Sequence, residues 1–344
     1  MKSRKKQNRS WRFERLENRQ LLAVDVQVLS GDLVVSGDAS GAVNITAQAD
    51  GSYVVTEGET TVGTYTGVTD DIKVTLDPDK SSDNDAVTID LGGKSVDSVT
   101  VSLGNGDNSL TVKNGTANGL IFQAAEGDDS LTIDATATIN KNVDVFFGSG
   151  DNSLTLSGKV GRGLNVRAGS GDDAITLAAG SNVGRDVNLN LGNGDNSLSA
   201  AGSIGRSLSV NAGVGDDLIE LLATSAIGRG VSINAGGGDN TLNSSADITG
   251  RLSYTGLGGN DTVTLGTEGA LNGSVDMKLG GGTNAFTLNA NVEGNLNVVS
   301  ANADDVLTVA DTATVSGTTN LGAGEQRRQR GGHFAGVMAM LFGR

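Results

Sequence analysis

The sequence lacks cysteine and holds one proline and one histidine among its 344 residues. Without cysteine there is no disulfide framework, so additional stability must come from packing or from bound ions. Aromatic residues make up only 3% of the chain, and the single histidine, His333, lies near the C-terminus, which makes it a weak catalytic candidate. No run of apolar residues reaches the length that a membrane-spanning helix needs, so we expect no transmembrane segment.

Basic residues are scarce outside the two ends. Residues 1–20 hold eight Lys and Arg against two acids, and residues 325–344 hold four Arg against one acid. The intervening residues 21–324 therefore carry 13 basic and 37 acidic side chains, a net charge of −24. Such an acidic body repels nucleic acid and attracts cations, so we expect no nucleic-acid partner.

Glycine, by contrast, is abundant, with 52 residues. Between the glycines lie mainly Val, Leu, Ile, Thr and Ser, a composition typical of short strands joined by tight turns. The turns return at intervals that alternate between 23 and 21 residues, so the repeating unit is 44 residues long. Aligned on the residue after the last glycine, they fall at Asn84, Asp107, Asp128, Asp151, Asp172, Asp195, Asp216, Asp239, Asn260, Thr283 and Asp304.

The residue that follows each of these positions alternates in step with the spacing. It is Asp at 85, 129, 173, 217, 261 and 305, and Asn at 108, 152, 196, 240 and 284. Between turns, apolar and polar residues alternate with a period of two, as in Leu154-Thr155-Leu156, which indicates strands with one buried face. Repeats of this length mark stacked architectures.

We therefore predict an all-β fold, a right-handed parallel β-helix (β-solenoid) of about 22 residues per coil. Four segments are expected: a basic N-terminal export tag over 1–23, an irregular β cap over 24–80, the parallel β-helix repeats over 81–322, and a basic and apolar tail over 323–344.

Stacking places equivalent turn residues about 4.8 Å apart. Two unit charges at that distance repel by about 1 kcal/mol in water and by roughly 3.5 kcal/mol at an effective dielectric constant of 20. Hydration, replacement of Asp by Asn, or a bound cation would each relieve this repulsion. Hard oxygen ligands at this density suit Ca²⁺. The predicted metal ligands are Asp107, Asp128, Asp129, Asp151, Asp172, Asp173, Asp195, Asp216, Asp217, Asp239 and Asp261.

The same turns resemble the RTX (hemolysin-type) nonapeptide GGxGxDxUx, in which Ca²⁺ sits between stacked Gly-Asp turns. Gly169-x-Gly171-x-Asp173-x-Ile175 and Gly213-x-Gly215-x-Asp217-x-Ile219 match its core. The turns here recur every 21 or 23 residues rather than every nine, and every second turn has Asn in place of Asp. The resemblance implies that the ligand aspartates are Asp129, Asp173, Asp217 and Asp261.

Residues 13–22, FERLENRQLL, resemble the FE-x-LE-x-R-x-LL tag that begins many large secreted or surface proteins of planctomycete bacteria. This resemblance implies export, and a secreted, extracellular or cell-surface location. The alternative is a basic leader with no targeting role.

Three functions remain open. The first is a structural or adhesive protein of the cell surface or matrix, stabilised by Ca²⁺ and bound to surface glycans or proteins. The second is a polysaccharide-active enzyme such as a lyase or glycosidase, which would need a local cluster of acids, Lys or His with aromatic platforms. The repeat is uniform and aromatics are rare, so we expect that the chain is not an enzyme. The third is a passive spacer.

Overall fold

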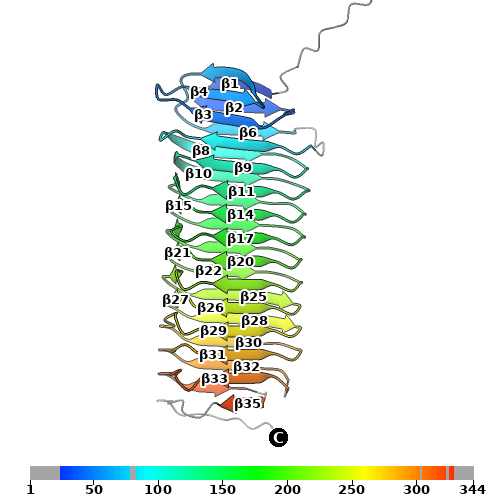
Figure 1. Ribbon diagram of the computed structural model, residues 1–344, viewed down its shortest axis with the longest axis vertical. Coiled ribbons are helices and arrows are strands. Elements are labelled where there is room, and N and C mark those ends of the chain that lie inside the picture. The colour runs from blue at the N-terminus through cyan, green and yellow to red at the C-terminus, as the bar shows by residue number, and fades with distance from the viewer. Residues whose placement is uncertain (1–23, 78–82, 303, 323–324, 329–344) are drawn as a thin grey trace, which may run out of the picture.

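The structure is a computed structural model, and it describes residues 24–77, 83–302, 304–322 and 325–328. All regular secondary structure within these ranges is β-strand, stacked as a solenoid of about 11 turns (Figure 1). The predicted all-β parallel solenoid is thus confirmed. Its strands form two sheets, one of 15 strands and one of 20.

Each coil contributes one strand to the 15-stranded sheet, directly after the Asp turn. Neighbours pair in parallel and in register, so that Leu131 lies beside Leu154 and Thr132 beside Thr155. The strands that follow the turns are β7 (Ala86–Asp90), β9 (Ser109–Lys113), β11 (Ser130–Ile133), β14 (Ser153–Leu156), β17 (Ala174–Leu177), β20 (Ser197–Ala200), β23 (Leu218–Leu221), β26 (Thr241–Ser244), β29 (Thr262–Leu265), β31 (Ala285–Leu288) and β33 (Val306–Val309). At the C-terminal end β35 (Glu325–Arg328) pairs with β33, and three strands at the N-terminal end complete the sheet.

The 20-stranded sheet receives the rest of each coil. In six of the described coils this is a short strand and then a longer one, whereas in the last coils isolated bridges replace the short strand. The short strands are β12 (Ala137–Ile139), β15 (Lys159–Val160), β18 (Asn182–Val183), β21 (Ser203–Ile204), β24 (Ala226–Ile227) and β27 (Asp247–Ile248). The longer strands are β2 (Asp32–Gly37), β6 (Ile72–Leu76), β8 (Ser95–Ser102), β10 (Gly115–Gln123), β13 (Val143–Phe146), β16 (Leu164–Arg167), β19 (Val187–Asn190), β22 (Leu208–Asn211), β25 (Val231–Gly237), β28 (Leu252–Gly258), β30 (Val275–Lys278), β32 (Leu296–Val299) and β34 (Thr319–Leu321).

At the N-terminal end, antiparallel strands join the stack. β1 (Val24–Leu29) pairs with β2, and β3 (Val43–Ala47) pairs with β4 (Tyr53–Glu57), which pairs with β5 (Thr60–Tyr65). Three strands of this region nevertheless continue the parallel ladder, because β2 pairs with β6, β6 with β8, and β3 with β7. The described part of residues 24–80 therefore contains both antiparallel strands and the first rungs of the solenoid.

The core lies between the two sheets and follows from the period-two pattern. Leu154 and Leu156 of β14 point inward, toward the layer that holds Leu164 and Val166 of β16, and all four are at most 1% exposed. Each such side chain contributes about 1.5–3 kcal/mol through removal from water. Every coil thus buries its apolar face against its neighbours.

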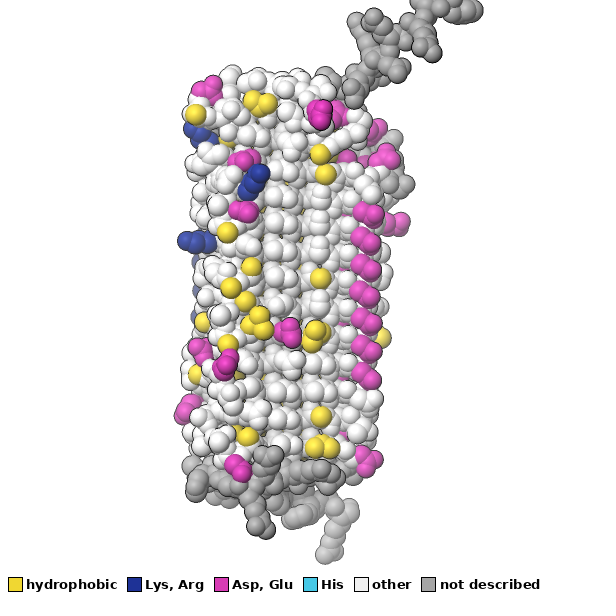
Figure 2. Space-filling model, viewed as in Figure 1, with side chains coloured by type: hydrophobic (Ala, Val, Ile, Leu, Met, Phe, Trp, Pro, Cys, Tyr) yellow, Lys and Arg dark blue, Asp and Glu magenta, His cyan; other side chains and the backbone are white. Residues whose placement is uncertain are grey.

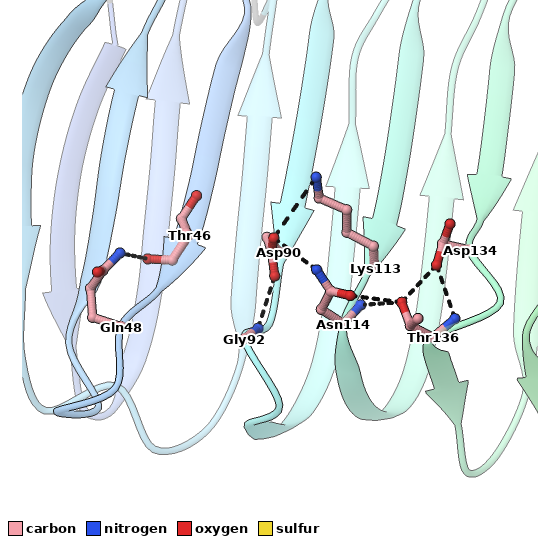
Figure 3. A network of polar contacts seen from close by, with 8 residues as sticks. All are labelled: Thr46, Gln48, Asp90, Gly92, Lys113, Asn114, Asp134 and Thr136. Atoms are coloured by element: carbon pink, nitrogen blue, oxygen red, sulfur yellow. Dashed lines mark hydrogen bonds and ion pairs between the residues drawn. The ribbon is translucent and has the colours of Figure 1, made fainter.

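The two extra residues of a 23-residue coil lie at the corner between β11 and β12. Ile133 is six positions before Ile139, whereas the equivalent Leu156 is four positions before Val160. A polar network joins successive coils at this corner (Figure 3). Asn114 donates to Asp90 at 3.0 Å and accepts from the Thr136 hydroxyl at 2.9 Å. The corner is therefore held by side-chain bonds between coils.

Candidate functional site: two rows of turn side chains

A tight glycine turn leads from the 20-stranded sheet to the 15-stranded sheet in each coil. Gly171 has φ +131°, and a Cβ atom on it would lie 2.2 Å from the carbonyl oxygen of Gly150 in the preceding coil. Only glycine fits such a close approach of two backbones. The turn places the next two residues on opposite sides, so that Asp172 is exposed and Asp173 is buried.

The exposed side chains form what we call the outer row. Figure 2 shows its carboxylates as a column along one edge of the rod. Each side chain accepts a hydrogen bond from the backbone N–H of its counterpart in the next coil, at 2.6–2.9 Å. The members are Asn84, Asp107, Asp128, Asp151, Asp172, Asp195, Asp216, Asp239, Asn260 and Thr283, which ends the row as a donor.

The buried side chains form the inner row, and its bonds run in the opposite direction along the rod. Here each backbone N–H donates to the side chain of the following coil, at 2.7–3.1 Å. No member is more than 4% exposed. The members alternate as Asp85, Asn108, Asp129, Asn152, Asp173, Asn196, Asp217, Asn240, Asp261, Asn284 and Asp305.

Asp and Asn in the inner row differ in the hydrogen bonds of their second polar side-chain atom, which is Oδ2 in Asp and Nδ2 in Asn. The Nδ2 atom of Asn152 donates both to the carbonyl oxygen of Gly150 at 2.8 Å and to Oδ1 of Asp173 at 2.9 Å. The Oδ2 atoms of Asp85, Asp129, Asp173 and Asp217 are buried, and no hydrogen-bond partner for them lies among the described residues. A buried carboxylate oxygen without a partner carries a large desolvation penalty.

The residue five positions before the inner row also alternates in size. It is Leu103, Phe147 or Leu191 in the first three Asn coils, and Ala124, Ala168 or Ala212 in the matching Asp coils. Two further Asp coils show that Oδ2 faces this position. Ser300 donates its hydroxyl to Oδ2 of Asp305, and a Cβ atom on Gly256 would lie 1.8 Å from Oδ2 of Asp261. The small residue therefore leaves room beside the buried carboxyls from Asp129 to Asp305.

Burial has a clear electrostatic consequence. It raises the pKa of Asp85, Asp129, Asp173 and Asp217 to about 6, because the charged form loses its hydration. Nearby carboxylates add to the rise, and for Asp129, Asp173 and Asp217 the bonds from the preceding Asn oppose it. Burial also raises the pKa of Asp261, against the bonds from Asn240 and the neighbouring hydroxyl of Tyr254.

The two rows differ in the oxygen atoms that they have available to bind Ca²⁺. The inner row offers buried carboxylate oxygens with no partner, which a cation would compensate, and backbone carbonyls lie in the same turns. In the outer row, one oxygen of each carboxylate already accepts a backbone N–H. Among the described residues no three acidic, His or Cys side chains converge, so a cation here would need carbonyl or water oxygens as well.

The structure thus places the eleven predicted ligands in two separate rows. Asp129, Asp173, Asp217 and Asp261 lie in the inner row, and Asp107, Asp128, Asp151, Asp172, Asp195, Asp216 and Asp239 lie in the outer row. The sequence identified two successive turn positions in each coil but was not used to assign one to the surface and the other to the interior, although the signal was present. Asp129 has the same parity as Leu131 and Ile133, and period-two counting would have turned it inward.

Comparison of the chain with protein-family models, with curated proteins and with solved structures finds no match. The function is therefore inferred from the inner and outer rows themselves. The described ranges contain no helix of the length and apolar character that crossing a membrane requires.

Proposed function

We propose that this chain is an exported structural or adhesive protein of the cell surface or matrix. The observation that supports this most is the uniformity of the outer row, in which one backbone-to-side-chain bond repeats from Asn84 to Thr283 without interruption. A rod of about 11 coils spaced by about 4.8 Å is on the order of 50 Å long. Such a rod presents the same side chains at regular intervals along its length, which suits a structural or adhesive role.

Calcium is the second part of this proposal. The inner-row aspartates Asp129, Asp173, Asp217 and Asp261 would hold the ion with carbonyl oxygens of their turns. Bound Ca²⁺ would neutralise the buried negative charge. The RTX-like motif and the buried Oδ2 atoms that lack a partner both support this assignment.

Export is supported by the sequence at residues 13–22, which lies outside the described residues. The test is the location of the intact chain in a planctomycete host, read by protease treatment of whole cells. We expect degradation of the chain from outside and weaker attachment of cells that lack it. A chain protected in intact cells until lysis would overturn the proposal.

The calcium assignment has its own test. Removal of divalent cations by EDTA is expected to lower the melting temperature, and Ca²⁺, but not an equal ionic strength of NaCl, is expected to restore it. Calorimetric titration should give a stoichiometry near one ion per 44-residue repeat. A melting curve that responds to neither EDTA nor Ca²⁺ removes the metal from the function.

A further inference from the structure

A long groove runs over the outer face of the 20-stranded sheet. Three hollows of about 640, 380 and 430 Å³ lie along it. The first and second share Ser209, and the second and third share Arg251, so each hollow adjoins the next along the rod. The groove extends from Asp144 on β13 to Asn320 on β34, and equivalent residues line it coil after coil.

The floor of the groove is built from amide and hydroxyl side chains in rows. Asn188 donates to Asn165 at 2.9 Å, and Asn211 donates to Asn190 at 2.7 Å. An amide has two donor hydrogens and an acceptor oxygen with two lone pairs. Asn165 and Asn211 each use one donor and one acceptor within their row, and the row fixes their orientation. These amides therefore retain one donor and one acceptor for an occupant.

The charge of the groove differs from that of the body. Its lining includes the carboxylates of Asp144 and Asp276 and the guanidinium groups of Arg167 and Arg251. Arg251 and Asp276 form an ion pair at 2.7 Å. The body over residues 21–324 has a net charge of −24. A groove with balanced charge in such an acidic molecule favours an occupant without net charge.

An aromatic side chain lies at the first hollow. Phe146 lines it beside Arg167, whose guanidinium carbon is 5.7 Å from the centre of the ring. The strands beneath the groove already pair on both sides, as β19 does with β16 and β22, which leaves no edge for an added peptide strand. An extended chain rich in hydroxyl groups fits this lining better than a peptide does.

We propose that the groove binds one strand of an uncharged polysaccharide, laid along the axis of the rod. This inference rests on the adhesive role proposed above and names the partner of that role. Successive sugar hydroxyls would meet the same donors and acceptors at successive coils, and Phe146 would pack against the apolar face of one sugar ring.

The experiment uses the full chain and calorimetric titration with soluble cello-oligosaccharides, xylo-oligosaccharides and mannan fragments as uncharged probes. Polygalacturonate and heparin serve as charged probes, and an extended Ser/Thr-rich peptide as the third class. We expect binding of at least one uncharged probe, and at least tenfold weaker binding by an Asn190→Ala/Asn211→Ala variant. The matched control, Thr155→Ala/Thr176→Ala, changes the outer face of the 15-stranded sheet and should bind as the parent does.

Ser209→Arg provides a second variant, because it fills the junction of two hollows and keeps the amide rows intact. It too should reduce binding at least tenfold at an unchanged melting temperature. Tighter binding of a charged probe or of the peptide, or no binding of any uncharged probe, overturns the inference. Those outcomes leave surface location and cell attachment to be judged separately, so failure of the groove and failure of the adhesive role are distinguishable.

Discussion

Each outer-row aspartate has two opposing effects on stability. Its carboxylate accepts a backbone N–H from the next coil, as Asp172 does from Asp195 at 2.6 Å, and such bonds to a charged acceptor stabilise the fold. The same carboxylates repel one another along the row by about 1 kcal/mol per neighbour in water. The bonds fix the row in place while the solvent screens the charges.

This balance predicts different outcomes for two substitutions of Asp172. Asp172→Ala removes the acceptor and should cost about 0.5–1.5 kcal/mol. Asp172→Asn keeps an acceptor oxygen, removes one charge and should leave the melting temperature equal or higher at low salt. Scanning calorimetry at low and high NaCl measures both. If Asn is as harmful as Ala, the charge itself is required, as a bound cation would require it.

The inner-row aspartates predict how stability depends on pH. Burial raises the pKa of Asp85, Asp129, Asp173 and Asp217 to about 6 in the folded state, above the ordinary value of 3.8, so the folded chain binds more protons than the unfolded chain between these values. Their contribution is therefore complete below about pH 4 and is lost as pH rises through 6. In calcium-free buffer we expect the melting temperature to fall between pH 4.5 and 7. A rise over that interval would contradict the assignment.

Asp173→Asn is the matched control for this pH dependence. The new amide would stand where Asn152 and Asn196 stand in their coils, and would donate to the carbonyl oxygen of Gly171. In EDTA at pH 7.5 we expect stabilisation of roughly 1–3 kcal/mol and a shallower pH slope. In Ca²⁺ the same variant should bind one ion fewer. Destabilisation in EDTA would show that the two turns are not equivalent.

At the scale of elements, each glycine turn has a position where no side chain fits. In one turn the glycine just before that position has open space for a side chain. A Cβ atom on Gly238, where φ is +122°, would lie 2.0 Å from the carbonyl oxygen of Gly215, whereas a Cβ atom on Gly237 would meet nothing within 4 Å. Gly238→Ala should therefore cost about 2–4 kcal/mol, and Gly237→Ala less than about 1 kcal/mol. Thermal unfolding of the two variants compares them directly, and equal losses would refute the close approach.

The same turns explain how much of the fold the sequence predicts. The 21- and 23-residue spacing identifies the strands of the solenoid because the two coil lengths alternate without interruption. Between β2 and β6 the paired residues Leu33 and Ile72 are 39 positions apart, and between β6 and β8 Ile72 and Val99 are 27 apart. The hairpin of β4 and β5 occupies part of the first interval. Insertions of this kind interrupt the 21- and 23-residue spacing in the sequence, although the strands still pair in parallel.

The sequence identifies the turn positions of the candidate site but not the arrangement of their side chains. Turn spacing identifies both aspartates of GSGDDAITL, but the direction of each side chain depends on where the strand parity begins. The groove was not predicted at all. Its rows come from outward residues such as Asn165 and Asn188, which are unremarkable within one strand and become a row only when the register between coils is known.

At the scale of the whole molecule, the solenoid is nearly one-dimensional, because each coil contacts mainly the coils above and below it. Its stability should then be a sum of coil terms and of interfaces between neighbours. The alternation of Asp and Asn makes the 44-residue pair, rather than the single coil, the smallest unit that can be removed without changing any interface.

Two deletions test this. Removal of residues 174–217 takes out one 44-residue repeat and leaves Asp173 next to Asn240 in the inner row. Removal of residues 174–196 takes out one 23-residue coil and leaves Asp173 next to Asp217, two buried carboxyls about 4.8 Å apart with no amide between them. At pH 7.5 in EDTA the first variant should fold with a melting temperature close to that of the parent, and the second should be much less stable. Because protonation removes the repulsion, the second variant should recover most of the difference at pH 5. Equal melting temperatures for the two deletions at pH 7.5 would show that the alternation has no role in the stability of the stack.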